Sequence, residues 1–359
     1  MYRVFQVVES FGGGVFQSVR QICNNLPRDL FEVYLIYSLR KETPSNWESL
    51  IREDVKKIYL PMTREISPIA DLKALFGLIK LIKRYDPHII HLHSSKAGFL
   101  GRLAAFLLRR KRVFYSPRGF SFLMKDVSVW KRALFFYLEK IAASFGGVIL
   151  ACSLSELAEA KKLSLKAKLL NNAIDLEEID EIPPHIFNED KIRVAIVGRV
   201  TYARAPWLFK NIACKLSSPL VEFLWIGGGE LEDEIKSSPV KVLGWLSRKE
   251  AISYLKGIDI YLQTSLWEGM PIAVLEAMAC SKPVVATDVV GNRDVVIHGE
   301  TGFVGKDENE LVLYLRRLIE NRDLRLKMGI QGRRRVEREF SLEVLIEKLS
   351  SLYLEVVKS

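Results

Sequence analysis

Two successive rounds of alternating strand-like and helix-like segments constrain the fold of this chain more than any other feature. Short apolar runs rich in β-branched and aromatic residues are typical of buried strands. They cover residues 2–8, 32–38, 89–93, 113–117, 148–153, 193–198, 222–228, 258–265 and 283–289. Helical patterns such as residues 67–85 separate them. The alternation predicts an α/β architecture, in which helices cover both faces of parallel sheets.

The break between the two rounds predicts two domains. A chain of 359 residues is long for a single hydrophobic core. The acidic, proline-containing segment 175–190 interrupts the alternation. We therefore expect residues 1–180 and 181–340 to form separate doubly wound domains, with a ligand-binding cleft at the carboxyl ends of their strands. Residues 341–359 follow the pattern of a closing amphipathic helix that is capped by a serine.

The composition is that of a soluble globular protein, with 49% hydrophobic and 27% charged residues. No apolar run approaches the roughly 18 residues of a membrane span, and the N-terminus leads into a strand without signal-peptide features. Four cysteines are scattered without metal-ligand spacing, which argues against a zinc site or a disulfide framework. We therefore expect a protein of the reducing cytoplasm.

The segment 267–280, WEGMPIAVLEAMAC, carries the most specific chemical signal. It places Glu268 and Glu276 eight positions apart around the start of an apolar helix, with Pro271 at the first helical position. The amide end of a helix favours an anion, and carboxylates accept hydrogen bonds from hydroxyls. A ligand with phosphates and many hydroxyls fits both properties, so the segment predicts a nucleotide-sugar site.

This spacing resembles the E-x7-E motif of the retaining glycosyltransferases of family 4. Residues 197–209 and 281–304 are similar to the same family. The resemblance runs over essentially the whole chain and is greatest to the branch that builds bacterial capsule, exopolysaccharide and O-antigen units. It implies the GT-B fold, in which two Rossmann-like doubly wound parallel-sheet domains face a cleft and the C-terminal helix crosses back to the first, acceptor-binding domain. The alternative is a helix that lies only on the second, nucleotide-sugar-binding domain.

The resemblance also implies how the donor is bound. Glu276 becomes the acceptor for the ribose hydroxyls, and Glu268 becomes the contact to the donor hexose. Further donor-binding positions are Gly13, Gly14, Gly198, Gly228, Gly244, Trp245, Gly269, Met270, Pro271 and Leu275. Taken singly, each of these glycines could instead belong to a structural turn.

Two arginines that follow the strand at 193–198 are candidates for holding the donor diphosphate. Arg199 and Arg204 offer bidentate hydrogen bonds to phosphate oxygens. The resembling loop has lysine and glycine where this chain has Arg204 and Ala205, so the charge is kept with a different geometry. The alternative is that both arginines are solvated. The resemblance implies that the departing phosphate oxygen takes the acceptor proton. Because the arginines can stabilise the leaving diphosphate, we expect neither a metal ion nor a cofactor.

Three residues of the first domain are candidates for the acceptor side. His91 and His93 flank Leu92 in a predicted strand, and we expect their side chains on opposite faces, with His93 facing the cleft. A lone histidine is more often structural. Arg118 stands where the resembling element has histidine. Because an arginine cannot act as a general base, it would instead bind an acceptor phosphate or developing negative charge.

Most of the formal net charge of +10 lies in the segment Lys96–Lys140, which has eleven basic and two acidic residues. Aromatic and aliphatic residues are interleaved with the charges, as in an interfacial helix. We expect this segment to bind the anionic inner face of the plasma membrane, where a lipid-diphosphate-linked saccharide acceptor is presented. The alternative is a solvated basic face. Nucleic acid is not expected as a partner, because no recognised binding module is present.

The sequence thus predicts a metal-independent retaining hexosyltransferase that moves a sugar from a nucleotide donor, with UDP as the expected nucleotide, to a lipid-linked saccharide in surface-polysaccharide assembly. Two alternatives stay open. One is a non-catalytic paralogue that binds nucleotide or membrane, and the other is a sugar-nucleotide epimerase of the same architecture.

Overall fold

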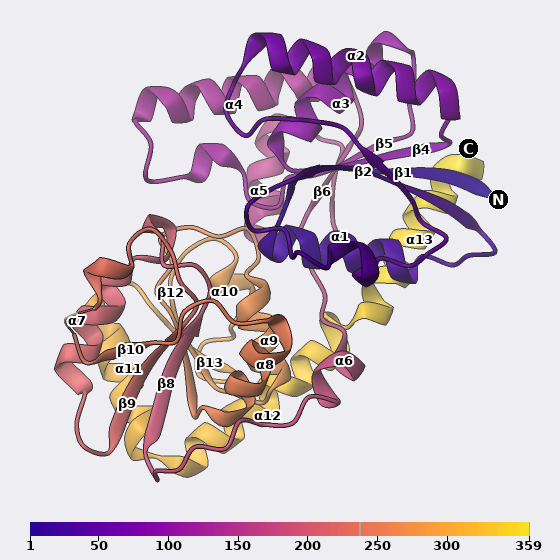
Figure 1. Ribbon diagram of the computed structural model, residues 1–359. Helices are drawn as coiled ribbons and strands as arrows, with labels where there is room; N and C mark the ends of the chain where they lie inside the picture. Colours follow the sequence, from indigo (N-terminus) through magenta and orange to yellow (C-terminus); the bar gives the residue numbers. More distant parts are fainter. Residues whose placement is uncertain (237, 359) are drawn as a thin grey trace. The chain divides into compact units, whose positions relative to one another are not determined.

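In the computed structural model, which describes residues 1–236 and 238–358, the chain folds into two units (Figure 1). Unit 1 consists of Met1–Asn172 and Glu343–Ser359, and unit 2 consists of Ala173–Leu342. Helix α6 (Leu176–Asp180), in the acidic segment, is tied to unit 2 by ion pairs of Asp180 with Arg333 and of Glu178 with Arg248. Each unit is built on its own parallel sheet, so the predicted fold class is confirmed.

Unit 1 contains a seven-stranded parallel sheet with the order β3-β2-β1-β4-β5-β6-β7. Its strands are β1 (Tyr2–Phe11), β2 (Phe31–Leu39), β3 (Lys56–Tyr59), β4 (Ile89–His93), β5 (Val113–Ser116), β6 (Val148–Ala151) and β7 (Ala167–Leu169). The central strand β4 is buried at every position, because helices cover both faces of the sheet. The strand order reverses between β1 and β4, which is where open parallel sheets bind ligands.

Helices cover the two faces of this sheet. They are α1 (Gly13–Asn25), α2 (Pro68–Tyr85), α3 (Ser95–Leu107), α4 (Val129–Ser144), α5 (Leu154–Leu163) and α13 (Leu342–Lys358). Figure 1 shows α2, α3 and α4 on one face and α1 and α13 on the other. The first face holds the main apolar cluster of the unit, to which β1 contributes Phe5 and Val7 and α2 contributes Leu78 and Ile82.

The C-terminal helix α13 packs on unit 1. Its Tyr353 is fully buried, with its ring centroid 5.7 Å from that of Phe31 and 5.3 Å from that of Phe114. Near the end of the helix, Glu355 forms an ion pair with Lys168 of β7. The last helix therefore crosses back to the first domain, as the fold class predicted.

Unit 2 contains a six-stranded parallel sheet with the order β10-β9-β8-β11-β12-β13. Its strands are β8 (Ile192–Val197), β9 (Val221–Ile226), β10 (Val240–Val242), β11 (Ile260–Gln263), β12 (Val284–Thr287) and β13 (Gly302–Gly305). Besides α6, its helices are α7 (Pro206–Leu216), α8 (Arg248–Gly257), α9 (Ile272–Ala279), α10 (Asn292–Val295), α11 (Glu308–Glu320) and α12 (Arg322–Glu339). The strand order reverses between β8 and β11, and the loops after these two strands carry the predicted Arg199, Arg204 and Glu268.

Candidate functional site

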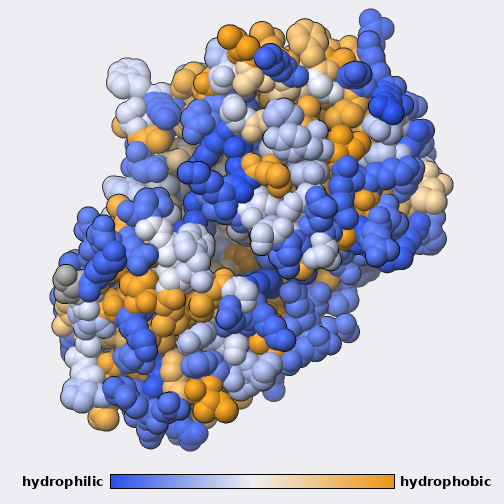
Figure 2. Space-filling view, viewed as in Figure 1, coloured by the Kyte–Doolittle hydropathy of each residue, from blue (hydrophilic) through white to orange (hydrophobic). Residues whose placement is uncertain are grey.

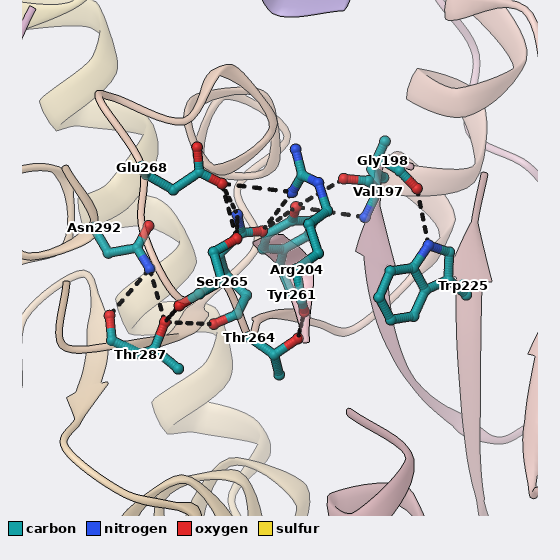
Figure 3. Close-up of polar contacts among 11 residues, drawn as sticks. Val197, Gly198, Arg204, Trp225, Tyr261, Thr264, Ser265, Glu268, Thr287 and Asn292 are labelled. Carbon is teal, nitrogen blue, oxygen red and sulfur yellow. Dashed lines mark hydrogen bonds and ion pairs between the residues drawn. The ribbon is translucent and has the colours of Figure 1, made fainter. Parts of the chain in front are cut away.

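The reversal point of the unit 2 sheet carries a cluster of polar side chains around Glu268 (Figure 3). Glu268 Oε1 accepts hydrogen bonds from Gln263 Nε2 at 2.9 Å and from Ser265 Oγ at 2.8 Å. The hydroxyl of Tyr261 donates to Gln263 Oε1 at 2.9 Å, and Tyr261 and Gln263 are fully buried. One carboxylate oxygen of Glu268 is therefore fixed by β11 and its loop. The other oxygen has no partner among the described residues and points away from the cluster.

Arg204 lies beside Glu268 at the same reversal point. Its Nη1 donates to Gln263 Oε1 at 3.3 Å and lies 3.8 Å from Glu268 Oε1. The hydroxyl of Thr264 donates to the main-chain carbonyl of Arg204 at 2.6 Å, which joins the loop after β8 to the loop after β11. In the part of the chain that the structure describes, Nε and Nη2 of Arg204 have no acceptor. Two nitrogens of the guanidinium are thus left for an anion.

Small residues let Arg204 come this close to the sheet. Gly198 has a φ of +139°, and a Cβ there would lie 2.6 Å from Arg204 Nε. Ala205, which follows Arg204, is fully buried with a φ of +45°. A left-handed backbone is strained for alanine, so the structure explains why the resembling loop has glycine here. Arg199, directly after Gly198, is half-buried.

Glu276 forms an ion pair that the sequence did not reveal. One of its carboxylate oxygens accepts from Arg248 Nη1, and Arg248 Nε donates to Glu178 at 3.3 Å. Burial by itself lowers the pKa of Arg248, but the two carboxylates more than offset this, so the pKa is raised. Arg248 begins α8 after the N-cap Ser247, and that capping signal is readable in the sequence. The ion pair of Arg248 with Glu276, 28 residues further along the chain, is not readable in the sequence.

Helix α9 differs slightly from its prediction. Pro271 is the N-cap, not the first helical residue, because its ψ of 115° is extended. The predicted burial is confirmed, since α9 is buried from Val274 to Ala279, which includes Leu275. Gly269 and Met270, just before the helix, are also buried.

The second glycine loop of unit 2 lies at the same sheet edge. The backbones of Gly227 and Gly244 pair as an isolated bridge, which places the predicted Gly228 and Gly244 together. A Cβ on Gly228 would lie 2.9 Å from the indole nitrogen of Trp245. The side chain of Trp245 is 65% exposed, so its ring is available to a ligand.

In unit 1, Gly13 and Gly14 occupy the first turn of α1, after the N-cap Gly12. Both are exposed, and no side chain caps this helix end. The structure therefore places their amides at the carboxyl end of β1, where the strand order reverses.

The prediction that His91 and His93 lie on opposite faces is wrong. Side chains two positions apart on a strand share a face, and the two ring centroids are 4.1 Å apart. Both residues are fully buried, so His93 does not face solvent. Burial and the nearby cation Arg118 lower the pKa of His91 well below the usual histidine value. The pKa of His93 is also lowered well below the usual value, by burial, by the neighbouring His91 and by Arg118. Both rings are therefore neutral at pH 7.

Arg118 is held at the carboxyl end of β5 in an unusual conformation. It has a φ of +61°, which is rare for a residue with a side chain and typical of functional sites. Its Nη1 donates to Asn172 Oδ1, and its Nη2 donates to His93 Nδ1 at 3.4 Å. The buried Nε has no acceptor among residues 1–236 and 238–358. Arg118 thus joins His93 but leaves donor capacity unused.

Two of the eleven basic residues in Lys96–Lys140 are not part of a solvated basic face. Arg102 is 1% exposed, and its Nη2 lies 2.7 Å from Glu139 Oε2. Tyr115 donates to the other oxygen of Glu139 at 2.7 Å, so this buried pair fastens α3 and α4 to the sheet. Arg118 belongs to the buried contacts just described. Because Glu139 is buried together with Arg102, the net surface charge of the segment is reduced only by the charge of Arg118.

Two family models match the chain one after the other. "Glycosyltransferase Family 4" matches residues 12–178, and "Glycosyl transferases group 1" matches residues 177–335. These matches coincide with two parallel-sheet domains of the expected class. The chain is a two-domain glycosyltransferase of the GT-B type.

Two curated relatives of this glycosyltransferase are named for capsular polysaccharide synthesis and for transfer to a lipid-linked sugar. The capsular polysaccharide biosynthesis glycosyltransferase CapM of Staphylococcus aureus is 29% identical over 326 residues, covering 83% of this chain and 85% of the relative. The UDP-Gal:alpha-D-GlcNAc-diphosphoundecaprenol alpha-1,3-galactosyltransferase of Escherichia coli is 28% identical over 362 residues, covering 92% and 91%.

Solved glycosyltransferase structures share the fold over nearly the whole chain. Sucrose-phosphate synthase from Thermosynechococcus elongatus superposes with a TM-score of 0.82 at 18% identity, over 99% of each chain. Anabaena HepE in complex with UDP and glucose superposes with a TM-score of 0.79 at 16% identity, over 98% of this chain and 99% of that one. At this level of identity the likeness shows the fold alone.

Proposed function

We propose that this glycosyltransferase moves a hexose from a UDP-sugar to a lipid-diphosphate-linked saccharide with retention of the anomeric configuration. The observation that carries the proposal is the state of Glu268. Its carboxylate is fixed through one oxygen by Gln263 and Ser265, while the other oxygen stays open beside the cationic Arg204. A fixed carboxylate is suited to the hydroxyls of a sugar, and a guanidinium is suited to the diphosphate attached to it.

The nucleoside lies, in this proposal, against Glu276 and the start of α9. Arg248 occupies one oxygen of Glu276, and the other has no partner in the described part of the chain, so it can accept from the ribose hydroxyls. The glycines at 228 and 244 and the exposed ring of Trp245 lie at the same sheet edge and complete the nucleotide pocket. The amide end of α9 adds a partial positive charge toward the diphosphate.

The leaving diphosphate is stabilised by Arg204 and Arg199 at the end of β8. In the proposed step, the acceptor hydroxyl oxygen attacks the anomeric carbon on the face from which the phosphate departs. The bond from that carbon to the phosphate oxygen breaks, and its electron pair stays on the oxygen. That oxygen takes the proton of the acceptor hydroxyl, so no side chain is required as a base. These two guanidinium groups can supply the positive charge without a metal ion.

The relatives support the choice of substrates. The E. coli relative is named for UDP-galactose as donor and a diphosphoundecaprenol-linked sugar as acceptor, and CapM is named for capsule synthesis. The fold neighbour HepE has been solved with UDP and with UDP-glucose, so the shared fold is compatible with this nucleotide.

A transfer assay tests the proposal. Purified protein is mixed with UDP-glucose, UDP-galactose or UDP-N-acetylglucosamine and a lipid-diphosphate-linked sugar, with a chelator present throughout. We expect acceptor-dependent release of UDP from one donor and, by proton NMR, a product with the anomeric configuration of that donor. UDP binding without transfer from any donor would favour a non-catalytic paralogue, and donor isomerisation without acceptor would favour an epimerase.

We also propose that unit 1 binds an anionic membrane surface, where such an acceptor is presented. On α4, the exposed apolar residues repeat at helical spacing: Trp130, Leu134, Tyr137 and Ile141, each 48% exposed or more. The exposed Lys131 and Lys140 lie on the same helix. No helix within the described residues is long and apolar enough to cross a membrane. An apolar stripe with lysines at its border is suited instead to the lipid headgroup region.

Helix α2, on the same face of the sheet, has a similar exposed stripe. Ile69, Leu72 and Phe76 are each more than half exposed. Figure 2 shows apolar side chains among charged ones over the edge of unit 1 that α2 forms. The sequence prediction had assigned the membrane surface to Lys96–Lys140 alone. We propose that α2 extends it.

Liposome flotation tests this surface. Binding to vesicles with anionic lipid should fall with added salt, and replacing Trp130 and Tyr137 by serine should release most of the protein. Leu165→Ser, at a site that is 93% exposed outside these helices, is the control. Equal binding to neutral vesicles, or equal loss with the control, would contradict the assignment.

A further inference from the structure

A continuous chain of buried hydrogen bonds connects the C-terminal helix to Arg118. We call it the Arg118–Ser116 chain, and in order its members are Arg118, His93, Gln6, Tyr353, His91 and Ser116. His93 Nε2 lies 2.8 Å from Gln6 Oε1, and Gln6 Nε2 lies 3.0 Å from the hydroxyl of Tyr353. That hydroxyl lies 2.6 Å from His91 Nδ1, and His91 Nε2 lies 2.9 Å from Ser116 Oγ. Gln6, His91, His93 and Tyr353 are all fully buried.

The direction of every hydrogen bond in the chain follows from Arg118. An arginine can only donate, so His93 Nδ1, its acceptor, carries no proton. The proton of the neutral ring is then on Nε2, which donates to Gln6 Oε1. Gln6 Nε2 therefore faces Tyr353 and donates to its oxygen.

The hydrogen bonds at the other end of the chain have their directions set by Tyr353. Because the oxygen of Tyr353 accepts from Gln6, its hydroxyl proton is directed to His91 Nδ1. The proton of His91 is then on Nε2, which donates to Ser116. A single arginine at one end fixes two imidazole tautomers and one amide orientation.

Arg118, at the end of this chain, is held in place by two neighbours and keeps one hydrogen-bond donor unused. Asn172 holds Nη1, and His93 holds Nη2. The guanidinium Nε is buried without an acceptor in the described residues. A non-glycine residue in a left-handed conformation persists only when its surroundings determine it, and here the following Gly119 amide donates to buried Glu156 at 2.8 Å. The carboxyl of Glu156 lies near Arg118, but Nε still lacks a hydrogen-bond acceptor, which an anionic oxygen would supply.

We propose that Tyr353 is a positioning residue, which orients Arg118 through Gln6 and His93 to bind a phosphate oxygen of the lipid-diphosphate acceptor. The inference rests on the proposed function for the identity of that acceptor. It assigns the C-terminal helix a role in the site of unit 1 in addition to its packing. Tyr353 touches neither substrate and acts only through the Arg118–Ser116 chain.

A double-mutant cycle tests the proposal by kinetics. Tyr353→Phe keeps the ring and removes the hydroxyl, which leaves Gln6 held at one end only. We expect the acceptor kcat/KM to fall about tenfold, the worth of roughly one buried hydrogen bond, with the KM for the UDP-sugar changed less than about twofold. In an Arg118→Ala background the same substitution should add less than about a twofold loss, because its effect passes through Arg118. Tyr34→Phe, which removes the hydroxyl of another buried tyrosine of unit 1, on β2, is the matched control.

Two outcomes would overturn the proposal. One is an equal loss from Tyr353→Phe with and without Arg118, which would mean a general structural effect. The other is a loss in Tyr34→Phe as large as that in Tyr353→Phe.

A second measurement does not depend on activity, so it separates this inference from the proposed function. Nitrogen-15 NMR of histidine-labelled protein should show His91 and His93 both protonated on Nε2 and uncharged at pH 6.5, the ordinary histidine pKa. Arg118→Ala should release His93 from this tautomer, and Tyr353→Phe should alter the Nδ1 shift of His91. A wild-type His93 protonated on Nδ1 would overturn the inference even in an active enzyme. The predicted tautomers in a protein that transfers nothing would leave the chain intact and remove the proposed function.

Discussion

The two sheets reverse their strand order at equivalent points, but they place different chemistry there. In unit 2 the loops after β8 and β11 bring Arg204 to Glu268 with unfilled hydrogen-bonding capacity on each. In unit 1, β4 carries two neutral, buried histidines whose hydrogen-bonding capacity is filled by other side chains. Of the described residues in this hydrogen-bonded chain, Arg118, after β5, is the one with a donor left over. Topology therefore locates both sites, whereas the state of the side chains decides which of them can meet a ligand directly.

The largest effect expected from this contrast is at Glu268. Replacing Glu268 by Gln keeps its shape and hydrogen bonds but removes the charge, so transfer should fall about a hundredfold or more, as for loss of a preorganised polar contact. UDP affinity should change little, because Glu268 is assigned to the hexose. Transfer assays measure the rate, and calorimetric titration measures the UDP affinity. The control is Glu347→Gln on the exposed side of α13. A rate near that of the wild type would remove Glu268 from the site.

A smaller effect on function is expected at Arg248, whose partner Glu276 is buried. Arg248→Met leaves that carboxylate without its cation, so unfolding free energy should fall by about 3 kcal/mol, and UDP should bind about tenfold more weakly. Chemical denaturation and UDP titration measure these changes. Arg293→Met, which breaks the more exposed pair with Asp288, should cost under about 1 kcal/mol. Unchanged UDP affinity in Arg248→Met would mean that Glu276 is positioned without it.

The smallest effect is expected at Ala205, and its sign is informative. Glycine relieves the strain of the left-handed backbone, which is roughly 1 kcal/mol or more for alanine. It also raises the conformational entropy of the unfolded chain, which lowers the stability of the folded protein by about 0.4–1 kcal/mol. Ala205→Gly should therefore be neutral or stabilising by up to about 1 kcal/mol, measured by denaturation. Ala213→Gly, in the interior of α7, should instead be destabilising by about 1 kcal/mol. A clear loss of stability in Ala205→Gly would show that its methyl group contributes packing that outweighs the strain.

The central strands were readable from the sequence, and the edge strands were not. The strands that the apolar runs missed are β3, β7, β10 and β13, which lie at the edges of the two sheets. They are short, and three of them contain lysine, as in KKIY, AKL and VKV. An edge strand is partly exposed and is protected from aggregation by charge, so the continuous apolar run that marks a central strand is absent.

The candidate site was readable where it depends on local spacing. Glu268 and its helix α9 lie within one short segment, so the motif located them. The pairing of Arg248 with Glu276, and of Tyr353 with His91, joins residues that are far apart in sequence. The placement of His91 and His93 could have been predicted from strand periodicity, because positions two apart share a face. Their neutrality depends on burial, which a strand pattern alone does not quantify.

The most direct test of the claim that the reversal point of unit 2 holds the nucleoside diphosphate is a calorimetric titration of UDP into three proteins: the wild type, Arg204→Ala and Arg118→Ala. Loss of a charge-assisted contact to phosphate should weaken binding to Arg204→Ala at least about tenfold, while Arg118→Ala should stay within about twofold of the wild type. Unaltered affinity in Arg204→Ala, or an equal loss in both variants, would contradict the account.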